Sequence, residues 1–249
     1  MKFSIVDSFS SPVIPLRYRA FSNTTDRYGV NYQYNSYGYR TVEFDQVDPE
    51  YAIVAGCSHT EGTATPLELT WGSVLEKQLK IQIVNLGVGS SNAVFCKKNI
   101  MSWVTSRSLL PKFVVVQWPN PFRLLSYSRM GAEFELLNGT DGQLINTTLK
   151  MSENNFLESW LSAIIDTNNI LQLLNIPCYN IHFQTQQDFQ IDIVNILKQH
   201  HIKIYLNENI TRVTWLLDSN AYDKSHHSTE CQQQWADRLT VIINENTTR

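Results

Sequence analysis

Residues 51–62 read YAIVAGCSHTEG and contain the strongest structural pattern in the chain. The apolar run 51–55 has the length and the residue types of a buried β-strand. Gly56 and Ser58 follow at once, and small residues directly after a strand are typical of a tight strand-to-helix turn. A serine on such a turn carries its hydroxyl out of the sheet, where a base can reach it. Ser58 is therefore a candidate nucleophile, although small residues also occur in ordinary loops between a strand and a helix.

Three later segments add, in chain order, the other groups that an acyl-transfer site needs. Residues 83–92, IVNLGVGSSN, predict a strand, a glycine turn and a helix start, where main-chain N–H groups lack helical partners. Residues 113–120, FVVVQWPN, predict a buried strand followed by the amide side chain of Asn120. Residues 223–226, DKSH, precede the last amphipathic helix and supply an acid and a base.

These four segments resemble the four sequence blocks of the SGNH hydrolases, also called the GDSL esterase family. The resemblance extends upstream to residues 35–40, NSYGYR, and covers about residues 31–245. It implies a flavodoxin-like, three-layer α/β/α sandwich with a central, mostly parallel five-stranded sheet. It also implies a serine esterase that uses no cofactor and no metal. The catalytic residues implied are Ser58, Asp223 and His226. The implied oxyanion hole consists of the N–H groups of Ser58 and Gly89 and the side-chain amide of Asn120.

The chain departs from the family pattern at several positions. Cys57 stands where the family has an aspartate before the serine. Gly89 is offset by one residue from the commoner spacing, so Ser90 is the alternative N–H donor. Trp118 replaces the glycine two residues before the asparagine, and His227 replaces the proline after the histidine. These departures indicate a less typical branch of the family and leave the oxyanion donor open between two neighbouring residues.

From residue 51 onward, apolar runs alternate with helical periods, which predicts βαβ units and a parallel sheet. We expect strands near residues 51–55, 81–85, 113–118, 176–183 and 202–206. We expect helices near residues 68–80, 91–107, 155–174, 188–200 and 229–244. Thr229 and Gln232 have the spacing of a capping box at the start of the last helix. Because ligands bind at the carboxyl ends of parallel strands, we expect Ser58, Gly89 and Asn120 to meet at that edge.

Two regions stand apart from this alternation. Residues 1–47 are rich in Tyr, Asn, Ser and Arg and have little period, so we expect an extension on the surface of a domain formed by residues 48–249. Contact with a partner is the alternative role of this extension. An insertion at about 121–153 predicts a β-hairpin, with arms at 132–137 and 143–146. This hairpin either walls the substrate cleft or decorates the surface.

The same region supplies the candidate substrate-binding residues. Trp118, Phe122 and Tyr127 are aromatic and lie beside the predicted site, so they are candidates for stacking on sugar rings. Arg123 is either a surface salt-bridge residue or a clamp for an acidic group of the substrate. We therefore expect an esterase that removes an acyl group, most simply an acetyl group, from a small molecule or an acetylated glycan. A non-catalytic carbohydrate-binding or virion structural module with the same fold is the alternative.

Composition narrows the function classes. The length of 249 residues fits one α/β domain with a sizeable core. A net charge of −3 without a Lys/Arg cluster argues against a nucleic-acid partner. The four cysteines lie far apart in sequence, which indicates reduced thiols and neither a disulfide framework nor a zinc site. His226 and His227 do not predict a metal pair, since consecutive residues rarely direct both rings at one ion.

The chain start lacks the apolar core of a signal peptide, and no segment approaches the roughly 20 apolar residues of a membrane span. These patterns predict a protein without a membrane partner that stays in the cytoplasm, or is carried on a virion if it is phage-encoded. The asparagine-rich, cysteine-poor sequence suits a phage structural component that trims host glycans, which would assemble into a larger complex.

Overall fold

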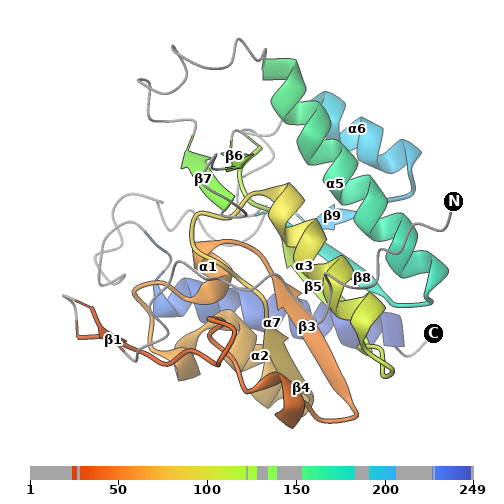
Figure 1. Ribbon diagram of the computed structural model, residues 1–249. Coiled ribbons are helices and arrows are strands. Elements are labelled where there is room, and N and C mark those ends of the chain that lie inside the picture. Colours follow the sequence, from red (N-terminus) through yellow and green to blue (C-terminus); the bar gives the residue numbers. More distant parts are fainter. Residues whose placement is uncertain are drawn as a thin grey trace, which may run out of the picture.

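A five-stranded parallel β-sheet forms the centre of the molecule and carries helices on both faces (Figure 1). In spatial order the strands are β4 (Gln82–Asn85), β3 (Tyr51–Ala55), β5 (Val114–Gln117), β8 (Cys178–Ile181) and β9 (Ile204–Tyr205). Every neighbouring pair of these strands is parallel. This computed structural model describes residues 24–26, 29–121, 123–127, 134–138, 153–182, 191–205, 226 and 228–247.

The helices form the two outer layers. One face of the sheet packs against α2 (Trp71–Leu79) and α7 (Thr229–Thr247). The other face packs against α3 (Ala93–Ser106), α5 (Glu153–Leu173) and α6 (Ile191–Gln199). Each of the five predicted strands and five predicted helices is present, with ends that differ by a few residues. The predicted three-layer α/β/α sandwich is therefore confirmed.

The continuous apolar run of β3 follows from its position in the middle of the sheet. Ile53 and Ala55 face the core cluster shared with α3 and α5. Ala52 and Val54 point to the opposite face and pack with α2 and α7. Since side chains of a strand alternate between faces and both faces are covered, every position must be apolar. The run YAIVA thus predicts a central strand of a parallel sheet.

Part of the predicted N-terminal extension belongs to the core. The described residues of this segment include β1 (Thr24–Thr25), β2 (Asn31–Tyr32) and a short 3₁₀ helix, η2 (Phe44–Gln46). Tyr39 and Phe44 are buried in the larger core cluster. The ring of Phe44 meets that of Trp103 edge-on, with 4.8 Å between centroids. The domain boundary near residue 47 stays a prediction, but residues before it help to bury α3.

The strand order reverses next to the predicted site. Numbered along the chain, the five sheet strands have the order 2-1-3-4-5, so the chain runs outward from β3 to β4 and then returns past β3 to β5. Ligands in such open α/β sheets bind where the strand order reverses, beyond the carboxyl ends of the strands. That switch point lies between β3 and β5. Ser58 follows the first of these strands and Asn120 follows the second.

The hairpin of the insertion differs from the prediction in its pairing. The strand β7 (Phe134–Asn138) pairs antiparallel with β6 (Arg123–Tyr127), which precedes it. The predicted second arm, 143–146, lies outside the described residues. Asn138, which the sequence places in a turn, is the last residue of β7. The hairpin stands over the same edge of the sheet as the switch point (Figure 1).

The helix α7 begins at the predicted residue, Thr229, but its capping residue differs from the prediction. Ser228 caps the helix, because its Oγ accepts the main-chain N–H of Cys231 at 3.2 Å. The predicted capping box of Thr229 and Gln232 is therefore wrong. The side chain of Gln232 turns instead toward α2, where its Oε1 accepts the main-chain N–H of Trp71 at 2.9 Å. This contact ties α7 to α2 just beyond His226.

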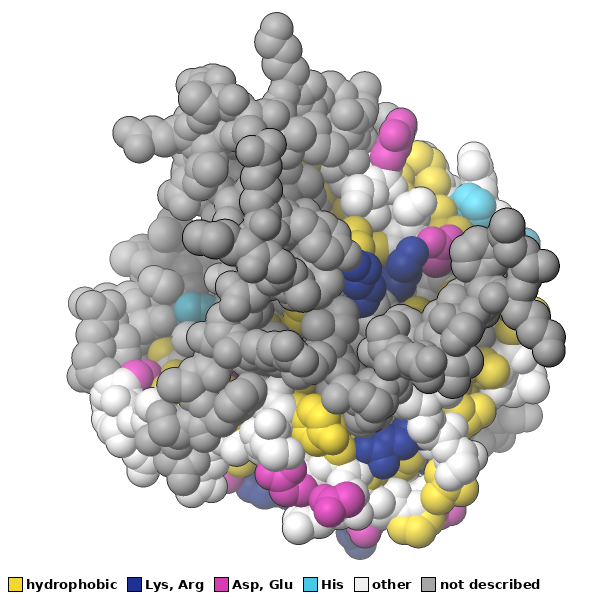
Figure 2. Space-filling view, viewed as in Figure 1, with side chains coloured by type: hydrophobic (Ala, Val, Ile, Leu, Met, Phe, Trp, Pro, Cys, Tyr) yellow, Lys and Arg dark blue, Asp and Glu magenta, His cyan; other side chains and the backbone are white. Residues whose placement is uncertain are grey.

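On the described surface, basic and acidic side chains are interspersed and do not gather in patches of one sign on the face seen in Figure 2. Of the helices in the described part of the chain, none combines the length and the apolar character that a membrane crossing requires.

Candidate active site

Ser58 is the first residue of α1 (Ser58–Glu61), a single helical turn that begins three residues after the end of β3. It is half-buried at the carboxyl edge of the sheet. A Cβ on Gly56 would lie 2.1 Å from Thr60 Oγ1 and 2.8 Å from the main-chain oxygen of Gln117. The turn therefore requires glycine at position 56, because α1 packs directly against the end of β5.

Gln117 anchors the serine turn, the residues 56–58 that join β3 to α1, to the end of β5. Its side chain is 3% exposed. Its Oε1 accepts hydrogen bonds from Thr60 Oγ1 at 3.1 Å, from Cys57 Sγ at 3.2 Å and from the Cys57 N–H at 3.4 Å. Its Nε2 donates to the main-chain oxygen of Trp118 at 3.1 Å. Gln117 was not among the residues predicted from the sequence, although an amide at the end of an apolar strand was the available signal.

The glycine loop after β4 packs backbone to backbone against α1. Asn85 Nδ2 donates to the Thr60 carbonyl oxygen at 2.7 Å, while Asn85 Oδ1 accepts the Gly87 N–H at 2.8 Å. A Cβ on Gly87 would lie only 2.5 Å from the main-chain nitrogen of Glu61. Glycine at position 87 therefore allows the loop to reach the serine helix.

The predicted oxyanion donor Gly89 is engaged inside the protein. Its N–H donates to Glu61 Oε2 at 2.7 Å. The next residue, Ser90, has a φ of 62°, in the left-handed region that favours glycine, and it is exposed. Within the described residues, the Ser90 N–H has no hydrogen-bond partner. This geometry contradicts the assignment of Gly89 and favours Ser90, the alternative that the sequence spacing left open.

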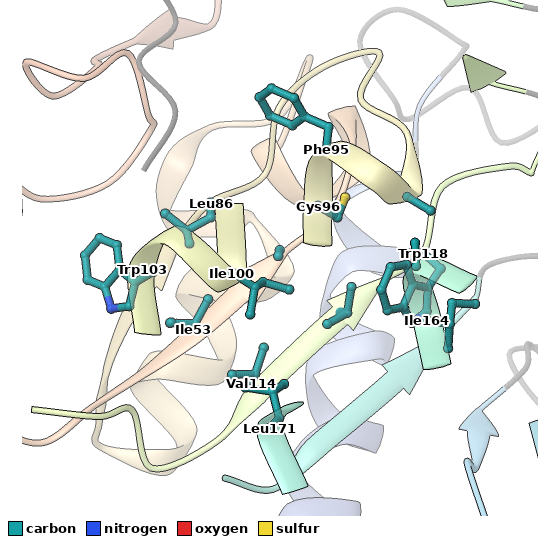
Figure 3. Packing of buried hydrophobic residues seen from close by; sticks show 14 of the residues in the cluster. Ile53, Leu86, Phe95, Cys96, Ile100, Trp103, Val114, Trp118, Ile164 and Leu171 are labelled. Carbon is teal, nitrogen blue, oxygen red and sulfur yellow. The ribbon is translucent and has the colours of Figure 1, made fainter. Parts of the chain in front are cut away.

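Trp118 belongs to the core and does not face a substrate. Its side chain is 0% exposed, and its Nε1 donates to Asn180 Oδ1 at 2.9 Å. Figure 3 shows it beside Ile164 of α5, within the larger core cluster. The prediction that Trp118 stacks on a sugar is therefore wrong. Asn120, two residues further on, is half-buried beyond the end of β5.

His226 lies next to the serine helix. Its ring packs against the ring of His59, with 5.1 Å between centroids and 57° between planes. Because His59 belongs to α1 and follows Ser58 directly, this contact places the predicted base against the helix that carries the predicted nucleophile. No hydrogen bond joins Ser58 Oγ to His226 in this structure, and such bonds are often long before substrate binds. Asp223 lies outside the described residues.

The remaining predicted substrate-binding residues stay predictions. Phe122 lies outside the described residues. Arg123 and Tyr127 are the first and last residues of β6, of which the backbone alone is described. Their strand stands over the correct edge of the sheet (Figure 1), so their placement in the chain agrees with a role near the site.

Arg40, from the upstream part of the family resemblance, supports the far end of the serine helix. It is 1% exposed, and its Nη1 donates to the carbonyl oxygens of Gly62 at 2.6 Å and Thr65 at 2.8 Å. Its guanidinium carbon lies 4.6 Å from the centroid of the Tyr32 ring. Burial lowers the pKa of Arg40 below its usual value. We interpret Arg40 as a structural residue that fixes the chain as it leaves α1.

His182 directly follows the strand β8, which neighbours β5, at the same edge of the sheet. Its main-chain N–H donates to the Tyr205 carbonyl oxygen at 3.0 Å, and its ring lies edge-on to Trp160 at 6.0 Å. Burial lowers the pKa of His182 to about 3. The ring is therefore neutral at pH 7, and its surroundings fit a packing role.

The described residues contain no group of three or more His, Cys, Asp or Glu side chains placed to hold a metal ion. All four cysteines are described, and no disulfide joins them. Cys57, next to the predicted nucleophile, is buried and directs its Sγ toward Gln117.

No protein-family model matches the chain, and no curated protein sequence does so. Solved structures do match. A G-D-S-L family protein from Desulfitobacterium hafniense is 16% identical, with a TM-score of 0.52 over 78% of this chain and 99% of that one. The esterase EstA from Pseudoalteromonas is 9% identical, with a TM-score of 0.50 over 80% of this chain and 100% of that one. The acetyl xylan esterase Est2A from Butyrivibrio proteoclasticus is 12% identical, with a TM-score of 0.52 over 80% of this chain and 64% of that one.

These similarities, together with the strand order, show that the chain has the SGNH/GDSL hydrolase fold. The identities of 9–16% establish the fold alone, because one fold can carry many different activities.

Proposed function

We propose that this chain is a serine ester hydrolase in which Ser58 is the nucleophile and His226 the general base. One observation carries the proposal: the ring of His226 lies against the serine helix at the switch point of the sheet. There the serine turn is held rigidly by Gln117 and by the close approach of Gly87. A nucleophile, a base and an amide donor on rigid supports are the parts that acyl transfer requires.

In the acylation step, Ser58 Oγ attacks the carbonyl carbon of the ester while His226 accepts the serine proton. The tetrahedral intermediate then collapses, and His226 returns this proton to the alkoxide leaving group. Water attacks the acyl-serine in a second step, with His226 again as the base, and Ser58 is released with a carboxylic acid. Asp223 is proposed to orient His226 and to stabilise its charged form, as the family resemblance implies.

The oxyanion is proposed to be stabilised by the N–H groups of Ser58 and Ser90 and by the side-chain amide of Asn120. Ser90 replaces Gly89 in this set because the Gly89 N–H is bonded to Glu61. Removing one oxyanion donor lowers kcat by about 100- to 1000-fold in well-studied hydrolases. Asn120→Ala is therefore expected to lower kcat by a factor in this range.

The substrate class that we propose is an acetyl ester, with an acetylated glycan as the finer assignment. The similarity to an acetyl xylan esterase supports this choice. Sugar stacking by Trp118 no longer supports it, since that ring is buried. The finer assignment depends on the hairpin, whose first strand includes Arg123 and Tyr127. Acetate release from acetylated xylan, compared with p-nitrophenyl acetate, tests this assignment.

A fluorophosphonate probe tests the proposed activity directly, because it forms a covalent bond with an activated serine. Wild-type protein is expected to gain one probe by intact mass spectrometry and to hydrolyse p-nitrophenyl acetate. Ser58→Ala is expected to lose both properties while keeping its circular dichroism spectrum. Ser106→Ala, at the exposed end of α3, is the matched control and keeps both.

Folded wild-type protein that remains unlabelled and inactive would refute the proposal and favour a non-catalytic carbohydrate-binding or virion structural module. Labelling that persists in Ser58→Ala would refute the nucleophile assignment alone. Asp223→Asn separates a triad from a dyad, since a silent substitution there alongside an inactive His226→Ala would mean that another group orients the histidine.

A further inference from the structure

We infer that Glu61 is a positioning residue of the active site, which holds the glycine loop so that the Ser90 N–H is presented to the oxyanion. The inference rests on the proposed function and adds a residue that the family resemblance does not assign. Glu61 is the last residue of the serine helix α1 and lies three residues after Ser58. It is only 3% exposed.

A carboxylate so deeply buried must be stabilised by specific partners. Glu61 Oε2 accepts the Gly89 N–H at 2.7 Å, which is the short distance typical of a bond to a charged acceptor. Glu61 Oε1 accepts from the hydroxyl of Tyr34 at 3.3 Å, and Oε2 also accepts from Thr63 Oγ1 at 3.5 Å. The positive charge of the buried Arg40 interacts with the same carboxylate. Glu61 therefore joins the serine helix, the glycine loop and the N-terminal segment at one point.

The bond to Gly89 fixes the loop at the position that matters for catalysis. Upstream, Gly87 already touches the Glu61 backbone, since a Cβ there would lie 2.5 Å from the Glu61 nitrogen. Downstream, Ser90 takes a left-handed φ of 62°, which a non-glycine residue adopts only when neighbouring contacts hold it. Glu61 thus clamps the loop at Gly87 through its main chain and at Gly89 through its carboxylate, directly before the residue whose N–H we assign to the oxyanion hole.

The clamp predicts an effect on the transition state more than on the ground state. A donor displaced by about 1 Å can lose about 100-fold in rate. We therefore expect Glu61→Ala to lower kcat for p-nitrophenyl acetate about 10- to 100-fold, with KM changed less than about threefold. Glu61→Gln keeps a side-chain oxygen that can accept the Gly89 N–H, so it is expected to retain most of the wild-type kcat.

Glu76 provides a matched control. Its Oε2 accepts the main-chain N–H of Ile83 at 2.8 Å, which is the same kind of bond at a site remote from Ser58. Glu76→Ala removes an equivalent carboxylate–amide bond and is expected to keep the wild-type kcat per folded molecule. A purely structural role for Glu61 would make the two alanine variants behave alike.

A second measurement reports on the clamp without turnover. A boronic acid that forms a tetrahedral adduct on Ser58 is expected to bind Glu61→Ala more weakly, by about the same factor as the loss in kcat/KM. The Gly89 amide proton is expected to resonate far downfield in wild type and Glu76→Ala, and to move upfield in Glu61→Ala.

The outcomes separate the inference from the proposed function. An active wild type with equal kcat in Glu61→Ala and Glu76→Ala overturns the positioning role. A loss that appears in KM alone, or boronate affinity that does not follow kcat/KM, also overturns it. An inactive wild type that the fluorophosphonate does not label refutes the proposed function, and the positioning role falls with it.

Discussion

Replacing Gln117 with methionine should destabilise the protein through the serine turn. Methionine has a similar length and fits an apolar environment, but it lacks the Oε1 that accepts from Thr60 and twice from Cys57. The two stronger hydrogen-bond donors are the Thr60 hydroxyl and the Cys57 N–H, and both residues are buried. Neither gains water when the acceptor is removed, so each is left unsatisfied.

A buried donor without a partner costs about 1–3 kcal/mol. The bond to Thr60 is 3.1 Å long and the one to the Cys57 N–H is 3.4 Å, so we assign the larger share of the effect to Thr60. The bond to Cys57 Sγ adds little, because a thiol is a weak donor. We therefore expect Gln117→Met to lower the free energy of unfolding by about 2–4 kcal/mol.

Urea unfolding followed by circular dichroism measures this change. The double variant Gln117→Met/Thr60→Val removes the hydroxyl as well as its acceptor, and it should recover about 1 kcal/mol or more, because loss of both partners is far less costly than loss of one. Gln78→Met is the control, since its exposed side chain bonds Asp237 at the surface, and it should change stability by less than about 0.5 kcal/mol. The reasoning is refuted if Gln117→Met is as mild as this control, or if Thr60→Val gives no recovery.

Two further predictions concern stability. Gly87→Ala should lower the free energy of unfolding by about 1–3 kcal/mol and should lower kcat, because its Cβ would meet backbone atoms. Gly72→Ala is the control. Gly72 lies within α2 and its Cβ would meet Val54 of β3 at 3.4 Å, so this variant should be neutral or stabilising in the same urea assay. The pKa of His182 is lowered to about 3 in the folded protein, against about 6.5 when unfolded, so the unfolded chain binds an extra proton between these pH values. The contribution of His182 to the free energy of unfolding is complete above pH 6.5 and falls by about 1.4 kcal/mol per pH unit below it. His182→Leu should remove that slope. If the slope between pH 4 and pH 6 is the same in His182→Leu as in wild type, the ring is not buried as described.

The sheet could be predicted from sequence because its strands are buried on both faces. A run such as YAIVA at 51–55 has few structural alternatives when it is short and followed by Gly56. The position of Ser58 follows from the same pattern, since the turn needs small residues. Local sequence therefore fixes both the layer architecture and the strand end that carries the nucleophile.

The same burial explains the error at Trp118. When both faces of a strand are covered, the alternation of side chains no longer distinguishes inward from outward positions. The ring follows β5 and lies against α5, which comes more than 30 residues later in the sequence, so its burial depends on a tertiary contact.

Errors of one residue arise where neighbours offer the same chemistry. Ser228 and Thr229 both carry hydroxyls that can cap α7, and packing decides between them. Gly89 and Ser90 both offer an N–H, and the choice depends on Glu61, which lies 28 residues earlier in the chain. In the hairpin, the strand 134–138 pairs with the preceding strand 123–127. The prediction instead paired it with residues 143–146, because a short turn follows it there.

The contacts that fix Ser58 also belong to the packed core, and this has a consequence for every activity measurement on the site. A Cβ at Gly56 would collide with both Thr60 and Gln117, so the turn that carries Ser58 packs tightly against the end of β5. Variants at these positions must therefore change stability and turnover together, and their kcat values report on the chemistry only per folded molecule. Glu61 differs from these core positions, because its carboxylate bonds Gly89, in a loop whose next residue, Ser90, is exposed. A loss of kcat in Glu61→Ala that exceeds the loss in an equally destabilised core variant would therefore measure the placement of the oxyanion donor and not the integrity of the sheet.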